Sequence, residues 1–542
     1  MSPRSHYATF YLGFAVFLVA LHVPYLRMPF HWDEMGQFVP AALDLFRDGA
    51  WVPHSTLANV HPPGVMAVLA LVWRAFGYSI LSARLTMLAI AAFAVLCAFL
   101  LAIRLSRQAS LQYRGMPAFA AVLLLIASPL FHAQSMLVLL DLPAMSLTAL
   151  ALLLFLNARY AACAAAATAL VLTKETALTT PLFFAAWLWF HDGKRREALY
   201  FAAPAAALAV WLVVLRHSTG HWLGNAEFAR YNVSDALSPL HILATLVRRV
   251  WFLFVSDGHF LGTLAIFLGR RILRGRDWNI ALGVAAAQVA AVTLFGGAGL
   301  ERYLLPALPV LYAAVAAAAL VYPVRWRTAS HAAMAALLVL GWVWNPPYPF
   351  PLENNLAMTD FTGLQKDAAA YLQAYAPDRR IATTWPFTDA LEHPEFGYVE
   401  RPQPIVKMED FTTQALSQLD PASYDLLVVY PRDTFATGSP SESAPVREFL
   451  RRYYSYHPPP TEDEIRTTLG LSPMMRIQRR GLWIEIYARD YRAEMTGPAT
   501  TGPARYYSPP RISRSKDQPA KWIFLKLFRR ITMSDAWDGS SL

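Results

Sequence analysis

The chain has 542 residues, of which 56% are hydrophobic and 15% charged, and its mean hydropathy is +0.32. A composition this apolar excludes a soluble enzyme of this size and indicates an integral membrane protein. The formal net charge of +10 does not indicate a nucleic-acid partner, because the arginines gather in short loops between apolar segments.

Apolar segments of bilayer-crossing length recur along the first 344 residues. A span needs about twenty apolar residues, and the pattern predicts about eleven spans. They lie at 8–26, 81–103, 116–136, 139–157, 160–173, 175–190, 198–215, 252–269, 278–296, 303–322 and 329–344. No small-residue cleavage site follows the first segment, so we expect it to be a span and not a signal peptide.

Basic residues in the loops predict the orientation. With the N-terminus in the cytoplasm, most basic loops are cytoplasmic; they hold Arg104/Arg107/Arg114, Lys194/Arg195/Arg196, Arg270/Arg271/Arg274/Arg276 and Arg325/Arg327. Arg248 and Arg249 are the one pair on the opposite side. An odd number of spans places the chain after Trp344 outside. The prediction is a multi-pass inner-membrane protein with its active site on the periplasmic face.

The first periplasmic loop is expected at 27–80. Apolar residues recur at helical spacing in 38–46, opposite Gln37 and Asp44, which predicts an amphipathic helix along the membrane surface. A second apolar stretch, 63–76, is too short to span upright and is expected to be re-entrant or interfacial.

A Pro-rich hinge at 345–349 divides the chain. It predicts a transmembrane domain at 1–345 and a small periplasmic α/β domain at 346–495. The segment 496–542 is expected to be disordered, with a basic amphipathic stretch at 522–530.

Short patterns in the small domain predict its elements. Leu364, Ala368 and Leu372 fit one helix, and 424–430 and 482–487 fit strands. The predicted fold class is therefore an α-helical polytopic membrane protein, with about eleven transmembrane helices and a small C-terminal α/β domain.

Charged residues recur at the predicted outer ends of the spans. Asp33 and Glu34 directly follow the first span. Four further sets of polar or charged residues lie on the same predicted outer face of the membrane: His61, Asp141, Lys174-Glu175 and Glu301-Arg302-Tyr303. Charge at membrane depth is costly and usually functional, so five sets on one face predict a single site. The competing interpretation is a group of solvated loop residues.

Several of these motifs resemble those of a known family. They are Asp33-Glu34, Gly49-Ala50-Trp51, His61-Pro62-Pro63, Phe76-Gly77 to Arg84-Leu85, Leu140-Asp141-Leu142-Pro143, Leu172-Thr173-Lys174-Glu175 and Glu301-Arg302-Tyr303-Leu304-Leu305-Pro306. Over residues 8–345 the chain resembles GT-C glycosyltransferases, in particular the protein O-mannosyltransferase and aminoarabinose transferase group. The resemblance implies a multi-span bundle with a lateral groove for a dolichyl- or undecaprenyl-phosphate sugar. It implies an inverting hexosyl or pentosyl transferase.

The chemistry of such a donor fits these residue types. A phosphate-linked sugar departs from a stable anion, so the reaction needs a carboxylate base for the acceptor and cations for the phosphate, but no general acid. Asp33 is the predicted base, and its counterpart in the family bears that role. Glu34 is expected to orient the loop or the acceptor. Asp141 would bind the acceptor, the donor sugar or a divalent cation, or would instead cap the fourth span. These three carboxylates are the predicted catalytic residues.

Cations at the same face are the predicted ligands of the donor phosphate. Arg302 offers the phosphate a planar guanidinium fork, and Lys174 offers it a point charge. The alternative for both residues is that they snorkel from the end of a span to the membrane surface. For Lys174 a further alternative is a local ion pair with Glu175. His61 is the third, although several family members have lysine there and histidine is neutral for much of the time near pH 7. The residues predicted to bind the acceptor or sugar are Glu301, Tyr303 and Glu175.

No cofactor is predicted, and a divalent cation is left open. The sequence has no HExxH motif, and His217 and His221 are separated by Gly220 in a loop, so solvated or hydrogen-bonded histidines are favoured over a metal site. The expected partners are a polyprenyl-phosphate-linked sugar, an acceptor that is a lipid, a glycan or a protein, and membrane lipid.

Three other functions compete. A transporter would also carry charges in a helical bundle, but the halves show no internal repeat and the charges lie at one face. A lipid-binding scaffold would not require Asp33. A glycan ligase on a similar architecture differs least. The sequence identifies neither the sugar nor the acceptor.

Overall fold

The computed structural model describes residues 3–113, 115–230, 237–296, 299–344, 352–431, 443–445, 447–448, 451 and 458–489. Met1–Arg489 forms one compact unit. The predicted tail 496–542 and its amphipathic stretch 522–530 lie outside the described residues.

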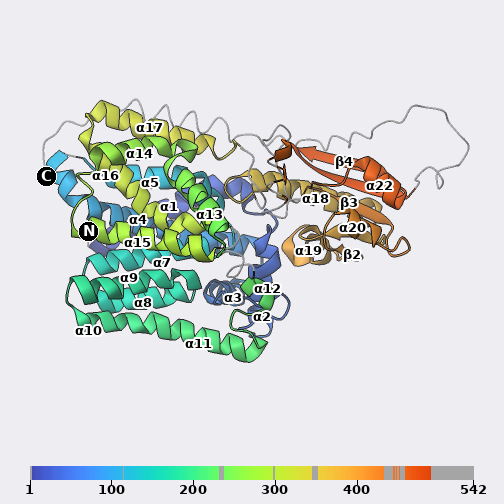
Figure 1. Cartoon of the computed structure of the whole chain (residues 1–542), viewed down its shortest axis with the longest axis horizontal. Coiled ribbons are helices and arrows are strands. Elements are labelled where there is room, and N and C mark those ends of the chain that lie inside the picture. The colour runs from blue at the N-terminus through green and yellow to red at the C-terminus, as the bar shows by residue number, and fades with distance from the viewer. Residues whose placement is uncertain are drawn as a thin grey trace, which may run out of the picture. The chain divides into compact units, whose positions relative to one another are not determined.

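The first 344 residues form a helical bundle (Figure 1). Its helices are α1 (Pro3–His22), α2 (Val39–Arg47), α3 (Gly64–Phe76), α4 (Ile80–Tyr113), α5 (Pro117–Ala127), α6 (Pro129–Gln134), α7 (Asp141–Leu156), α8 (Tyr160–Val171), α9 (Thr179–Ala186), α10 (Arg195–Ala198), α11 (Ala202–Thr219), α12 (Ala226–Ala229), α13 (Pro239–Phe254), α14 (His259–Gly269), α15 (Arg276–Phe295), α16 (Leu308–Ala318) and α17 (Val324–Leu340). Short 3-10 or π-helical turns that bear on the site are η2 (Glu34–Phe38), η3 (Glu175–Leu178), η7 (Ser256–Gly258) and η8 (Glu301–Ala307).

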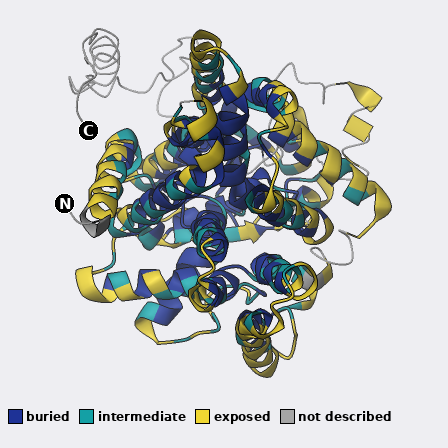
Figure 2. Ribbon diagram, turned by 90° about the vertical axis from the view of Figure 1, so that its left-hand side faces the viewer, coloured by how far each residue is buried: buried dark blue, intermediate teal, exposed yellow. Residues whose placement is uncertain are grey.

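The core of the bundle lies around α4 and α16. α4 packs against α1, α5, α7 and α16, and α16 is buried along almost its whole length. Figure 2 shows the buried residues gathered at the centre and the exposed ones on the outer helices. Large apolar side chains on these helices, such as Val210 and Trp251, are exposed, as expected for a surface that faces lipid.

In the described part of the chain, five helices are long and apolar enough to cross a membrane, and a sixth span results if the bent pair α13 and α14 counts as one. Together with the shorter apolar helices, they confirm a polytopic helical membrane protein. Two predicted spans are interrupted. The segment 116–136 breaks at Ser128, because Pro129 disfavours helix at the residue before it. The segment 175–190 consists of η3, α9 and a π-helical turn, Trp187–His191.

The predicted span at 252–269 differs from the structure in its start. The helix that precedes it, α13, begins at Pro239, and the chain bends by 43° between α13 and α14. Asp257 in η7 has a positive φ of 50°, which a continuous helix cannot accommodate. The apolar pattern missed α13 because Arg248 and Arg249 interrupt it.

Both predicted helices of the first loop are present, as α2 and α3. The assignment of Asp44 to the solvent face of α2 is wrong, because its side chain is buried and accepts the backbone N–H groups of His54 and Ser55 at 2.8 and 2.9 Å. At the start of α3, Gly64 donates to the Leu172 carbonyl oxygen at 3.0 Å. A Cβ at Gly64 would lie 2.5 Å from that oxygen. Glycine thus lets the first loop approach the end of α8 closely.

The described residues from 352 to 489 form an α/β part of this compact unit, which we call the small domain. Its helices are α18 (Ala357–Tyr375), α19 (Phe387–Glu392), α20 (Thr413–Ser417) and α22 (Glu462–Leu469), and its strands are β1 (Ile381–Thr384), β2 (Ile405–Met408), β3 (Leu426–Val429), β4 (Leu471–Arg479) and β5 (Leu482–Arg489). The sheet order is β2-β1-β3-β5-β4. β1 pairs in parallel with β2 and β3, and β5 runs antiparallel to β3 and β4. The predicted helix and two strands are α18, β3 and β5.

Direct hydrogen bonds join this domain to the first loop. Phe30 donates its backbone N–H to the Phe396 carbonyl at 3.0 Å. The Tyr398 hydroxyl donates to the Phe30 carbonyl at 2.8 Å, and the Tyr78 hydroxyl donates to the Glu395 carbonyl. The stretch that leads into Asp33 is therefore held by the small domain as well as by the bundle.

Candidate active site

Asp33 lies in a sharp turn between α1 and α2. Trp32 before it has a positive φ of 43°, an unfavourable conformation for a bulky residue that is often found at functional sites. Glu34 holds the turn: its carboxylate accepts the His31 N–H at 2.8 Å and the Val138 N–H at 2.7 Å. Arg84 binds both carboxylate oxygens of Glu34, at full burial of both side chains. Glu34 therefore anchors the loop from behind.

Arg302, the second residue of η8, is the centre of a buried ion cluster. Its guanidinium pairs with the carboxylates of Asp33 and Glu353, and its Nε lies 3.3 Å from Asp141 Oδ2. Lys174 pairs with the other oxygen of Asp141, and its Nζ lies 4.1 Å from the ring centroid of Tyr303. Two cations therefore face three carboxylates in a site that is almost closed to solvent.

These contacts decide between a site role and the simpler structural roles considered for Asp141, Lys174 and Arg302. The N-cap of α7 is Leu140 and Asp141 is its first helical residue; since Asp141 pairs with Lys174 and Arg302, the capping interpretation is wrong. Lys174 and Arg302 are each about 5% exposed and do not snorkel to the surface. Lys174 pairs with Asp141 instead of Glu175. Residues from three distant segments thus meet at one point, as the sequence predicted.

Glu353 belongs to this cluster and sequence reasoning missed it. It lies just after the hinge, where its backbone carbonyl accepts from Gln134 Nε2 at 3.1 Å. Its neighbour Asn354 donates to Glu301 at 2.8 Å. Burial, helped by the charges of Asp33 and Asp141 and opposed by Arg302, raises the pKa of the Glu353 carboxyl to about 8. Its sequence context, a polar run after a Pro-rich hinge, gives no signal that would single it out.

The raised pKa of Glu353 predicts a pH-dependent stability. The carboxyl binds its proton more tightly in the folded protein, at a pKa of about 8, than at its ordinary value of 4.5. The free energy of unfolding should therefore fall as the pH rises from about 4.5 to 8. We expect Glu353→Gln to flatten this slope in thermal unfolding of the purified protein. Glu400→Gln, at an exposed position of the small domain, is the matched control. An equal slope in wild type and Glu353→Gln would contradict the assignment.

His61 pairs with Glu175 across the opening of the cluster. The two side chains meet at 2.8 Å between Nδ1 and Oε2, and the His61 backbone N–H donates to Asn59 Oδ1 at 3.0 Å. Asn59 in turn donates to Gln37 at 3.0 Å. The first loop and η3 are thereby joined beside Lys174.

Glu301 faces away from this cluster. Its carboxylate binds Arg248, with one contact of 2.8 Å to the Nη2 group, and it accepts from Asn354. Arg249 is buried and donates to the carbonyls of Val292 and Leu300. Arg248 and Arg249, which do not fit the predicted distribution of basic loops, therefore lie on helix α13 and stabilise η8. They are not loop residues that set the orientation of the chain.

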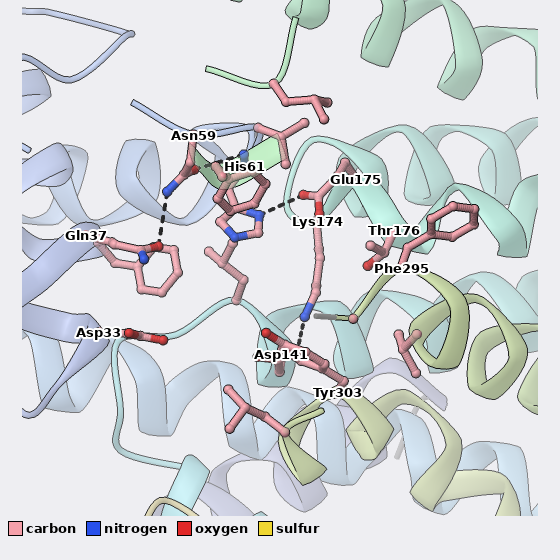
Figure 3. A pocket seen from close by; sticks show the side chains of 18 of the residues that line it. Asp33, Gln37, Asn59, His61, Asp141, Lys174, Glu175, Thr176, Phe295 and Tyr303 are labelled. Atoms are coloured by element: carbon pink, nitrogen blue, oxygen red, sulfur yellow. Dashed lines mark hydrogen bonds and ion pairs between the residues drawn. The ribbon is translucent and has the colours of Figure 1, made fainter. Parts of the chain in front are cut away.

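One cavity of about 990 Å³ opens onto the ion cluster. Of the predicted site residues, its lining contains Asp33, His61, Asp141, Lys174, Glu175, Arg302 and Tyr303, whereas Glu34 and Glu301 do not line it. Figure 3 shows Asp33 and Gln37 on one side and Lys174, Tyr303 and Phe295 on the other. An apolar part of the wall comes from η3, α9, α11 and α15; it includes Leu178, Leu182, Leu208, Leu212 and Phe295. The cavity therefore combines a charged end with an apolar one.

Among the described residues, the group of carboxylates and imidazoles close enough to hold a metal ion is Asp44, Asp48 and His54. Asp44 already accepts two backbone N–H groups there, and none of the three lines the cavity. At the ion cluster, the carboxylates of Asp33 and Asp141 pair with Arg302 and Lys174. The carboxylates of the ion cluster are therefore already paired with cations and offer a divalent cation no ready set of ligands there.

No protein-family model matches this chain, and no curated protein matches it. Solved structures do match this chain. ArnT from Cupriavidus metallidurans bound to undecaprenyl phosphate is 16% identical, with 88% of this chain and 98% of that chain covered and a TM-score of 0.50. The apo form of the same protein is 14% identical over the same shares, with a TM-score of 0.51. At these identities the similarity shows the fold alone, which this chain shares with ArnT.

Proposed function

We propose that this protein is a membrane glycosyltransferase that moves a sugar from a polyprenyl-phosphate carrier to an acceptor. The observation that carries the proposal is the single cavity that joins the Arg302 cluster to an apolar wall. A polyprenyl-phosphate sugar is itself divided in this way, with an anionic head and a hydrocarbon tail. The same fold in ArnT has been solved with undecaprenyl phosphate bound, which supports a lipid phosphate in this chain.

The reaction needs one bond exchange at the anomeric carbon. The acceptor oxygen forms a bond to that carbon from the face opposite the phosphate, the carbon–oxygen bond to phosphate breaks, and the configuration inverts. The proton of the acceptor hydroxyl passes to Asp33. Polyprenyl phosphate leaves with one more negative charge than it had in the donor, and Arg302 and Lys174 lie where they would stabilise that charge.

The ion cluster also suggests how Asp33 becomes free. In this structure Arg302 donates to its carboxylate, so that oxygen is not free to bind the acceptor hydroxyl. Donor phosphate bound to Arg302 would take over that contact and leave Asp33 to bind the acceptor hydroxyl. Glu353 and Asp141 keep Arg302 in place during the exchange. Donor binding before acceptor activation is the order that follows.

Reconstitution tests the function directly. The purified chain in proteoliposomes would be mixed with a panel of undecaprenyl-phosphate-linked hexoses and pentoses, and loss of donor would be followed by mass spectrometry. We expect at least one donor to be converted to undecaprenyl phosphate with transfer or hydrolysis of its sugar. Intact donors throughout, at a protein concentration where binding of undecaprenyl phosphate is measurable, would contradict the proposal.

The proposal places about eleven spans in the inner membrane, with the cavity and the small domain on the periplasmic face. We expect alkaline phosphatase fused after Arg489 to be active and the same enzyme fused after Arg274 to be inactive, because the basic loops stay in the cytoplasm. Immunoblots of both fusions control for expression. The reverse pattern would invert the orientation.

A further inference from the structure

One wall of the cavity is built from two tryptophans and two polar side chains. Trp32 and Gln37 come from the first loop, and Trp385 and Asp389 come from the small domain. The ring centroids of the two indoles lie 4.8 Å apart at an interplanar angle of 70°. Both indoles are half-buried. We call these four residues the tryptophan wall. Their partly exposed surfaces face the cavity beside Asp33.

Close packing fixes both indoles. Trp32 adopts its unfavourable positive φ and packs against Phe361, with ring centroids 6.4 Å apart. Trp385 lies directly over Gly36, where an added Cβ would be 2.9 Å from its Cζ2 atom. Glycine at position 36 thus allows the indole to rest on the backbone of η2. An aromatic surface held this firmly costs little side-chain entropy when a ligand binds to it.

The polar groups of the wall suit hydroxyls. The Gln37 oxygen already accepts from Asn59, and its amide nitrogen has no hydrogen-bond partner among the described residues, so it can donate to a ligand. Asp389 accepts from the Thr388 hydroxyl at 3.2 Å and retains acceptor capacity toward a ligand. A sugar ring presents C–H groups on its faces and hydroxyls on its rim. Aromatic faces flanked by amide and carboxylate groups match both.

The charges of the wall do not suit an anion. It carries the Asp389 carboxylate, lies next to Asp33 and contains no lysine or arginine. The cations of the cluster, Arg302 and Lys174, are paired with carboxylates. Arg230 also lines the cavity, but it does not belong to the tryptophan wall. It directly follows α12, whose Phe228 packs against His61. A phosphate at the tryptophan wall would face two carboxylates without a cation from the wall to balance them.

We infer that the tryptophan wall is the acceptor subsite and that the acceptor is a hydroxyl-bearing saccharide without a charge at its accepting ring, as opposed to a lipid phosphate. The inference rests on the proposed function and specifies its acceptor. One sugar ring stacks on Trp385 and Trp32, with its hydroxyls bonded to Gln37 and Asp389. This arrangement brings a further hydroxyl to Asp33, which takes its proton as the new glycosidic bond forms and polyprenyl phosphate departs.

Ligand binding can be tested without turnover. Saturation-transfer-difference NMR would be recorded on the full-length chain in lipid nanodiscs, with methyl hexosides and methyl pentosides as probes and the corresponding sugar 1-phosphates for comparison. We expect saturation of the ring C–H protons of at least one methyl glycoside, and loss of that signal in Trp385→Leu. Trp483→Leu, in β5 of the same domain and outside the cavity lining, should keep it. Absence of the signal in wild type, an equal signal in Trp385→Leu, or stronger binding of the sugar phosphates would overturn the inference.

Turnover then separates acceptor from donor. Alkyl glycosides and a phosphorylated lipid, phosphatidic acid, would be offered as acceptors with the undecaprenyl-phosphate sugar that the chain consumes. We expect transfer to an alkyl glycoside, a KM for that glycoside raised about tenfold in Trp385→Leu, and a smaller rise in Trp385→Phe. Tenfold corresponds to about 1.4 kcal/mol, the scale of one aromatic contact. The KM for the donor should stay within about twofold.

The outcomes distinguish the two proposals. A methyl glycoside that binds to a chain unable to consume any donor would refute the glycosyltransferase function and leave the saccharide subsite in place. Transfer to phosphatidic acid but to no alkyl glycoside would refute the inference and keep the function. A rise in the KM for donor equal to the rise for acceptor would place the donor sugar on the wall, and would overturn the inference too.

Discussion

Asp33→Asn should lower turnover by roughly 10² to 10⁴. Asparagine keeps the size of the side chain and a hydrogen bond to Arg302, but it cannot accept the proton of the acceptor. Donor binding should survive, because Arg302 and Lys174 remain in place. Above the pKa of Glu353, about 8, stability should change little as well, because the cluster then holds two cations and two carboxylates in place of two cations and three carboxylates. Steady-state kinetics with the donor identified by reconstitution measures the effect.

Two variants of the same loop make this result specific. Asp48→Asn removes an exposed carboxylate outside the cavity and should leave turnover unchanged. Glu34→Gln should reduce the yield of folded protein, because Gln cannot accept from Arg84, His31 and Val138 together. Near-normal turnover by Asp33→Asn would exclude it as the base. If Asp141→Asn were then the inactive variant, the base would be the second carboxylate.

The helical part of the fold could be predicted because hydrophobicity carries most of its information. A span or a buried helix requires a long apolar segment: the segment at 278–296 corresponds closely to α15, and the segment at 81–103 to α4 without its last ten residues. Prediction failed where a proline broke a segment, as at Pro129, or where charge lay on a buried helix face, as at Arg249. At Arg249 tertiary contacts decide the outcome and leave no periodic pattern in the sequence, whereas the break at Pro129 is a local effect of proline that the apolar pattern does not record.

Part of the site could also be predicted from the sequence, because charged residues beside apolar segments are easy to recognise. A charge next to an apolar segment is conspicuous, so Asp33, Lys174 and Arg302 stand out without a structure. Glu353 and Trp385 do not, because they lie in polar sequence where a carboxylate or an indole is unremarkable. Only the return of the chain after residue 351 brings Glu353 to the ion cluster and Trp385 to the cavity. A contact between segments hundreds of residues apart has no local signature.

Arg302→Ala should be the most damaging change to the cluster. It would leave Asp33, Asp141 and Glu353 buried around Lys174 alone, and an uncompensated buried charge costs about 3 to 5 kcal/mol of stability. The burial of Arg302 therefore predicts a lower thermal midpoint for this variant. Loss of a charged hydrogen-bond donor to phosphate should also weaken donor binding by roughly 1.5 to 3 kcal/mol.

A second substitution separates these two effects. Arg302→Ala combined with Glu353→Gln removes one of the carboxylates that Arg302 balances, so thermal stability should recover in part while undecaprenyl phosphate binding stays weak. Arg248→Ala, which loses a partly exposed partner of Glu301 outside the cavity, is the matched control and should bind the carrier normally. Thermal unfolding and native mass spectrometry with undecaprenyl phosphate measure the two quantities. Unchanged carrier binding in both Arg302→Ala and Lys174→Ala would place the phosphate elsewhere, because the cavity then holds no other buried cation among its described residues.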